Sequence, residues 1–196
     1  QFFSPRCSPW SKANTTSKVE TKARARQDER PGLQWIAYRC KQMFDTNGTK
    51  AFILETPHGS QLLTDSPYAN IHKHKSTSLA ILDQCQHGAK NIDSRGLPNK
   101  KTTVLDYTGI NINQTTSLRC SGENKCAYHG ELSGNIPGTN MWRTATAAVY
   151  PWNMCMAIGT DVWQLTHGDH GTLSLMVFWT RDDASMELDI LERTCE

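Results

Sequence analysis

The segment Lys50-Ala-Phe-Ile-Leu-Glu55 is the most informative starting point for the fold of this 196-residue chain. Its centre is a short apolar run, and such a run between turn residues predicts a buried strand. Asn47-Gly48 stands just before it, and both residues tolerate the positive φ of a tight hairpin turn. Before that turn, Leu33-Gln-Trp-Ile-Ala-Tyr-Arg-Cys40 is rich in aromatic and β-branched residues. We therefore expect residues 33–40 and 50–55 to form an antiparallel hairpin.

Helices and one more strand are expected downstream of this hairpin. Residues 76–89 begin with Ser-Thr, a pair that caps helices, and we expect a helix with Cys85 on or near its buried face. Residues 102–107, Thr-Thr-Val-Leu-Asp-Tyr, have the composition of a strand. Residues 141–150 are rich in alanine and predict a helix, which Pro151 either ends or continues into a second helical turn.

The last part of the chain predicts a second hairpin. Thr172-Leu-Ser-Leu-Met-Val-Phe-Trp-Thr180 has the alternation of a strand, and apolar Met186, Leu188 and Ile190 alternate with acidic residues after a polar turn. Strands then stand both before and after the helices. This order favours an α+β fold in which antiparallel hairpins pack with two or three helices, rather than a doubly wound parallel sheet.

Seven cysteines indicate a chain that folds outside the reducing cytosol. Cys7 stands alone in a polar segment, whereas the other six fall in the body and are able to close three disulfides. The sequence leaves their pairing open, and Cys120 and Cys126 either close a small loop or each join this loop to the body. The six body cysteines are Cys40, Cys85, Cys120, Cys126, Cys155 and Cys195.

Three Asn-x-Thr triplets support the same compartment. They predict glycosylation at Asn14, Asn47 and Asn113. No apolar run approaches the roughly 20 residues that cross a bilayer, so we expect no transmembrane segment. We therefore expect a secreted, extracellular glycoprotein held by three disulfides.

Residues 1–30 differ from the rest of the chain in charge and hydrophobicity. They hold seven basic and three acidic residues, a net charge of +4, whereas the remainder carries −2. From Ser11 to Arg30 the only large aliphatic residue is Val19, so we expect a disordered leader ahead of one domain at 31–196. Lys22-Ala-Arg-Ala-Arg26 resembles a processing site, and cleavage after Arg26 would remove Cys7. The alternative is a solvated run of charges. The acidic remainder predicts no nucleic-acid partner.

His167-Gly-Asp-His170 is the densest group of titratable residues. Imidazole and carboxylate at this spacing are able to perform acid and base chemistry, which makes His167, Asp169 and His170 the candidate catalytic residues, with Glu131 as a neighbouring acid. The alternative is a glycine-flanked surface turn. No Cys-x-x-Cys pair and no nucleotide, zincin or nucleophile-elbow motif appears, so we expect no metal site and no cofactor.

These features favour a binding function over catalysis. We expect the protein to bind a protein or cell-surface target, as secreted toxins and effectors do. The first alternative is a secreted, nuclease-like hydrolase that uses the His167 group. The second is a structural or storage glycoprotein without a specific target.

Overall fold

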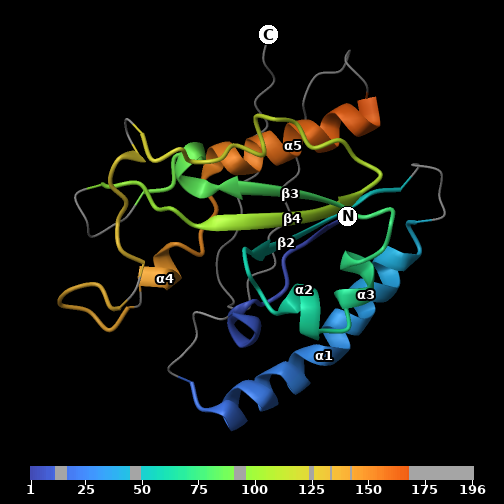
Figure 1. The fold of residues 1–196 in the computed structure, drawn as a ribbon, viewed down its shortest axis with the longest axis horizontal. Coiled ribbons are helices and arrows are strands. Elements are labelled where there is room, and N and C mark those ends of the chain that lie inside the picture. The colour runs from blue at the N-terminus through green and yellow to red at the C-terminus, as the bar shows by residue number, and fades with distance from the viewer. Residues whose placement is uncertain are drawn as a thin grey trace, which may run out of the picture.

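The computed structural model describes residues 1–11, 17–44, 50–90, 96–123, 126–132, 134–141 and 143–167. These residues form a mixed four-stranded sheet with helices on both faces (Figure 1). The order across the sheet is β1 (Phe2–Phe3), β2 (Phe52–Pro57), β4 (Thr102–Thr108) and β3 (Ser78–Asp83). β1 runs parallel to β2, and the other two pairs are antiparallel. The class is α+β.

The sheet separates two apolar clusters. Phe52 and Leu54 of β2 pack on the side of α1, whereas Ile53 between them packs on the opposite side with Leu105 and Met154. This alternation follows from the two-residue period of a strand. The predicted strands at 50–55 and 102–107 are confirmed as β2 and β4, and both are buried on both faces.

The helices form the outer layers of the molecule (Figure 1). One face of the sheet is covered by α1 (Val19–Lys41), α2 (Leu62–Asp65) and α3 (Ala69–His72), and the other face by α5 (Trp152–His167). The shorter helices are η1 (Ser8–Trp10), η2 (Gln84–His87) and α4 (Arg143–Thr146).

The predicted strand at residues 33–40 is wrong, because this segment is the second half of α1. Leu33 and Cys40 are buried, and Ile36 and Ala37 between them are partly buried against the same cluster. This spacing of i, i+3, i+4 and i+7 is that of one helix face. The strand prediction rested on the aromatic and β-branched composition and overlooked the period.

Residues 19–30, expected to be disordered, form the first half of α1. Ala, Arg, Lys, Gln and Glu dominate this stretch, and all of them favour helix on intrinsic propensity. Tertiary contacts add to that preference. Trp10 is buried, and the Arg26 guanidinium lies 4.9 Å from the centre of its ring.

The sequence predicts a helix over residues 76–89 with Cys85 on or near its buried face, and this prediction is wrong. Residues 78–83 form β3, and Cys85 follows in η2. Ala80 and Leu82 pack in one cluster while Ile81 packs against the other, so burial alternates as in a strand. Pairing with β4 along the whole of β3 outweighs the capping residues at its start.

Of the helix predicted at 141–150, only the four residues of α4 are helical. The helical turn predicted after Pro151 is instead the 16-residue helix α5. The predicted hairpin at 172–190 lies outside the described residues. Among the helices that the structure describes, none combines the length and apolarity needed to cross a membrane.

Candidate metal centre

Three cysteines and one histidine converge beside the end of β3. Cys85 lies in η2, and Cys120, Cys126 and His129 lie in the long segment between β4 and α4, which we call the ligand loop (residues 109–141). Their ligating atoms all lie within 4.8 Å of one another. Cys120 Sγ lies 3.5 Å from His129 Nε2.

Cys85 is held in place by a tight turn. The turn of η2 is closed by backbone hydrogen bonds from Gly88 N to Cys85 O, 3.3 Å, and from Ala89 N to Gln84 O, 3.1 Å. Gly88 ends the turn at a φ of 87°, a left-handed conformation that glycine adopts without steric cost. The Cys85 thiol is buried as a result.

Asp83 ties the ligand loop to the sheet. Its buried carboxylate accepts hydrogen bonds from Cys120 N at 2.9 Å, from Arg119 Nε at 3.0 Å and from the Thr102 hydroxyl. The backbone N–H of Asp83 also donates to Leu118 O, 2.9 Å. Although burial opposes ionisation, the hydrogen bonds from Cys120, Thr102 and Arg119 hold the pKa of Asp83 below its ordinary value.

The three sulfurs differ in their electrostatic environment. Burial, followed by contact with Cys120 and Cys126, raises the pKa of Cys85 to about 12. Burial and Cys120 also raise the pKa of Cys126. At Cys120 burial is opposed by the Gly122 backbone N–H and the two neighbouring thiols, which lower the pKa. A divalent cation bound by these three sulfurs would release the protons that they carry.

A neighbouring amide also contacts the sulfurs. Gln86 Nε2 donates to Cys126 Sγ at 3.2 Å and lies 3.9 Å from Cys85 Sγ. Such hydrogen bonds orient ligating sulfurs and reduce the negative charge that they carry when a metal is bound.

The donor set fits a single tetrahedral zinc ion. Three thiolates and one imidazole form one of the usual structural zinc sets. Ligands about 2.3 Å from a tetrahedral ion lie about 3.8 Å from one another, since the bonds meet at roughly 109°. Ligating atoms that all lie within 4.8 Å are therefore close to the required separation, and only small side-chain rotations separate them from it.

The predicted set of three disulfides is not supported. Cys7, Cys40, Cys85, Cys120, Cys126 and Cys155 are all free thiols, and Cys195 lies outside the described residues. Cys40 is buried in the apolar cluster beside α1, where burial raises its pKa to about 12. Three of the remaining cysteines instead share the site with His129. Parity of the cysteine count therefore did not indicate pairing.

The residues predicted for catalysis do not form a described cluster. His167 lies at the exposed end of α5, stacked on the ring of Trp163 with the centroids 3.6 Å apart. Asp169 and His170 lie outside the described residues. Glu131 pairs with Arg143 at 3.5 Å.

Of the predicted glycosylation sites, Asn14 and Asn47 lie outside the described residues. The Asn113 carboxamide nitrogen donates to Asp161 Oδ1 and, at 2.9 Å, to Gln164 Oε1. A glycan on that nitrogen would replace one of these two hydrogen bonds. Glycosylation at all three positions stays a prediction.

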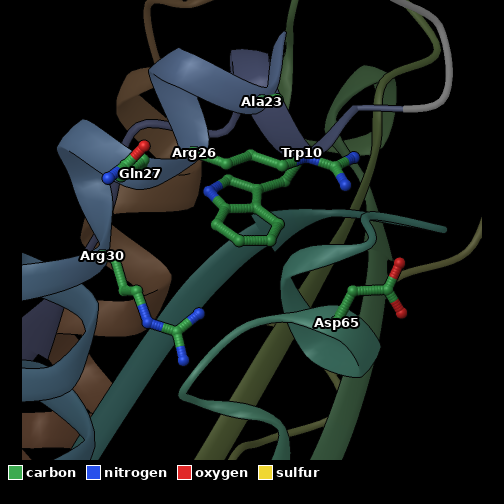
Figure 2. A pocket seen from close by; sticks show the side chains of 6 residues that line it. All are labelled: Trp10, Ala23, Arg26, Gln27, Arg30 and Asp65. Carbon is green, nitrogen blue, oxygen red and sulfur yellow. The ribbon is translucent and has the colours of Figure 1, made fainter. Parts of the chain in front are cut away.

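The predicted processing residue, Arg26, lies inside α1. Its Nε donates to Pro9 O at 2.9 Å, and its guanidinium also donates to Gln61. Arg26 and Trp10 line an open cavity of about 380 Å³. Figure 2 shows the two side chains next to each other, with Arg30 and Asp65 also lining the cavity. This cavity contains none of the four metal-site residues. The cavity is lined by side chains of both charges, and its Arg26 already donates hydrogen bonds to Pro9 and Gln61, so the lining indicates no particular ligand.

The signal that identifies the ligand loop in the sequence is Cys126-Ala-Tyr-His129. It has the spacing of a Cys-x-x-Cys pair with histidine in the second position, and Cys120 stands six residues before it. A search for cysteine pairs alone misses it. Cys85 carries no comparable signal, because its distance from the loop is set by the β3–β4 pairing.

Comparison of the chain with protein-family models, with curated proteins and with solved structures finds no match.

Proposed function

We propose that the protein binds one zinc ion through Cys85, Cys120, Cys126 and His129, and that this ion is structural. The observation that carries the proposal is the convergence of four ligating atoms, from two separate segments, within 4.8 Å. Carboxylates are not part of the group, and the soft sulfur donors favour zinc over calcium or magnesium.

A structural role follows from the number of protein ligands. Four side chains complete a tetrahedral shell, whereas catalytic zinc sites supply three ligands and leave one position to water or substrate. The centre would join the ligand loop to η2 and hence to the end of β3. The described part of the loop forms no helix or strand, and backbone hydrogen bonds within it close local turns, such as that from Cys126 N to Glu123 O, 3.0 Å.

The stabilised domain is, in our proposal, a binding module rather than an enzyme. Tyr128 stands between two of the proposed ligands and is 78% exposed, so the centre would hold an aromatic side chain in solvent at a fixed position. Exposed aromatic side chains on a rigid support are typical anchors for protein partners. Secretion and a cell-surface target remain predictions. The hydrolase alternative rests on Asp169 and His170, outside the described residues.

Metal analysis of protein purified under reducing conditions tests the zinc proposal. We expect about one zinc per chain, and a Co²⁺-substituted sample with the intense visible absorption of tetrahedral sulfur coordination. Cys126→Ser should lose most of the metal. Cys155→Ser, a change of a half-buried cysteine on α5 outside the group, should retain it. Wild-type protein that binds no zinc, or zinc that survives Cys126→Ser unchanged, would overturn the proposal.

A further inference from the structure

We propose that the zinc centre is also a redox switch, in which a hydroperoxide oxidises Cys120 and Cys126 to a disulfide and expels the metal. This inference rests on the proposed zinc site. In the second state of the centre, Cys120 and Cys126 form a disulfide, and their sulfurs already lie within 4.8 Å of each other.

The centre has one open side and one closed side. Cys85 and Cys126 are buried, whereas Cys120 and His129 are only half-buried. A small oxidant coming from solvent therefore meets Cys120 before the other two sulfurs. Ser121, Gly122 and Glu123, which follow Cys120, are all exposed, so this part of the loop lies at the surface.

Cys126 is the sulfur that should complete the disulfide. It lies within 4.8 Å of Cys120, and both belong to the same irregular loop. A disulfide brings two sulfurs to about 2.05 Å, so side-chain rotation with a small loop adjustment is needed. Cys85 is less suited, because η2 and the end of β3 fix its backbone.

The reaction balances with the peroxide as oxidant. The Cys120 thiolate attacks one peroxide oxygen, the O–O bond breaks, and Cys120 becomes a sulfenic acid while hydroxide leaves. The Cys126 sulfur then attacks the Cys120 sulfur and displaces the second oxygen, also as hydroxide. Two thiolates have lost two electrons, and two protons from solvent turn both hydroxides into water. The Zn²⁺ leaves without changing its oxidation state.

Loss of two ligands is sufficient to release the ion. Cys85 and His129 alone would form a two-ligand site, which falls short of the four protein ligands of structural zinc. The carboxylate of Asp83 would still hold the backbone of Cys120. The start of the ligand loop is therefore expected to stay attached to β3 in the oxidised state, and a reductant with added zinc should restore the centre.

The test uses full-length, zinc-loaded protein under anaerobic conditions with one equivalent of hydrogen peroxide. A chromogenic chelator measures zinc release, and intact mass with peptide mapping locates any disulfide. We expect about one equivalent of zinc released with a mass loss of about 2 Da, assigned to Cys120–Cys126. Dithiothreitol with zinc should reverse both changes.

Two variants sharpen the result. Cys155→Ser should behave as the wild type, whereas Cys85→Ser, which keeps both reacting sulfurs, should still form the Cys120–Cys126 disulfide. Zinc retained after peroxide treatment, or a disulfide mapped to other cysteines, would overturn the switch and leave the zinc site standing. Protein that never binds zinc would instead refute the zinc site.

Discussion

Asp83 is the single residue on which the attachment of the ligand loop to the sheet depends most. Its buried carboxylate accepts hydrogen bonds from three donors, and these come from β4 and from two residues of the loop. Replacing it by alanine leaves the half-buried Thr102 hydroxyl and Cys120 N–H without this acceptor, whereas the exposed Arg119 is able to bind water instead. The cost of such a change exceeds that of one lost surface contact.

We expect Asp83→Ala to lower the free energy of unfolding by about 3 kcal/mol, because the charged acceptor and its hydrogen bonds are lost together. Denaturant titration of the zinc-loaded protein measures this. Asp65→Ala, which removes an exposed carboxylate of α2, is the control and should change stability by less than about 0.5 kcal/mol. Equal effects of the two substitutions would contradict the role assigned to Asp83.

Glu55 makes the stability of the fold depend on pH. It lies buried in β2, where its carboxyl contacts the hydroxyls of Ser4 and Tyr150. Burial raises the pKa of Glu55, although Lys101 and the two hydroxyls oppose the shift. A folded-state pKa above the unfolded one contributes stability that is complete below the unfolded value and is lost as the pH rises through the folded value.

Glu55→Gln should therefore gain stability relative to the wild type as the pH rises above about 4.5, the ordinary value for a glutamate. Paired denaturant titrations from pH 4 to pH 8 measure the difference. Glu20→Gln, an exposed change on α1, serves as the control and should give a flat difference. A flat difference for Glu55→Gln as well would show that its carboxyl ionises equally in both states.

Among the elements, α1 departs most from the sequence expectation. Leu33 is nearly inaccessible to solvent in the middle of the helix and packs with Phe52 and Leu54 of β2. We expect Leu33→Ala to cost about 3 kcal/mol of unfolding free energy, since it leaves a cavity in a packed cluster. Gln34→Ala, on the exposed face, should cost almost nothing. Circular dichroism during denaturation measures both, and equal effects would argue against the docked helix.

The elements show which sequence signals were sufficient. Residues 50–55 were predictable as a strand from their apolar centre and the turn before them, and residues 102–107 from their β-branched and aromatic composition. Residues 78–83 also pair as a strand, but capping residues precede them and misdirected the prediction. Residues 33–40 were misassigned because composition was used where burial period is the better guide. The intrinsic helix or strand preference of a segment is overridden where strand pairing or core packing contributes more free energy to the fold.

The metal centre was only partly predictable for a related reason. Cys126 and His129 stand at a ligand spacing that the sequence displays directly. Cys85 enters the site only because the ligand loop, after leaving the far end of β4, returns to the end of β3 at Asp83, next to η2. The disulfide prediction rested on the even number of cysteines in the body. That number does not show whether a cysteine is placed next to another cysteine or next to a histidine.

On the scale of the whole molecule, the centre and the sheet should behave as separate units of stability. The two apolar clusters contain residues of the four strands and of α1, α2, α3 and α5, and among the described residues of the ligand loop only Ile110 and Ile112, at its start, pack against them. We expect chelation of zinc by EDTA to increase hydrogen exchange in residues 126–132 while the amides of β2 and β4 stay protected. Uniform loss of protection would instead make the metal necessary for the whole fold.

The two residues of β1 cover part of the backbone edge of β2. Phe2 and Phe3 pair with Ile53 and Leu54, and the Arg26 contact with Pro9 and Trp10 holds the following segment on α1. A protease that cut after Arg26 and released this segment would uncover the backbone edge of an apolar strand. Such an edge is a template for strands of other chains, so the trimmed protein should precipitate or form fibrils on storage while the intact protein stays dispersed.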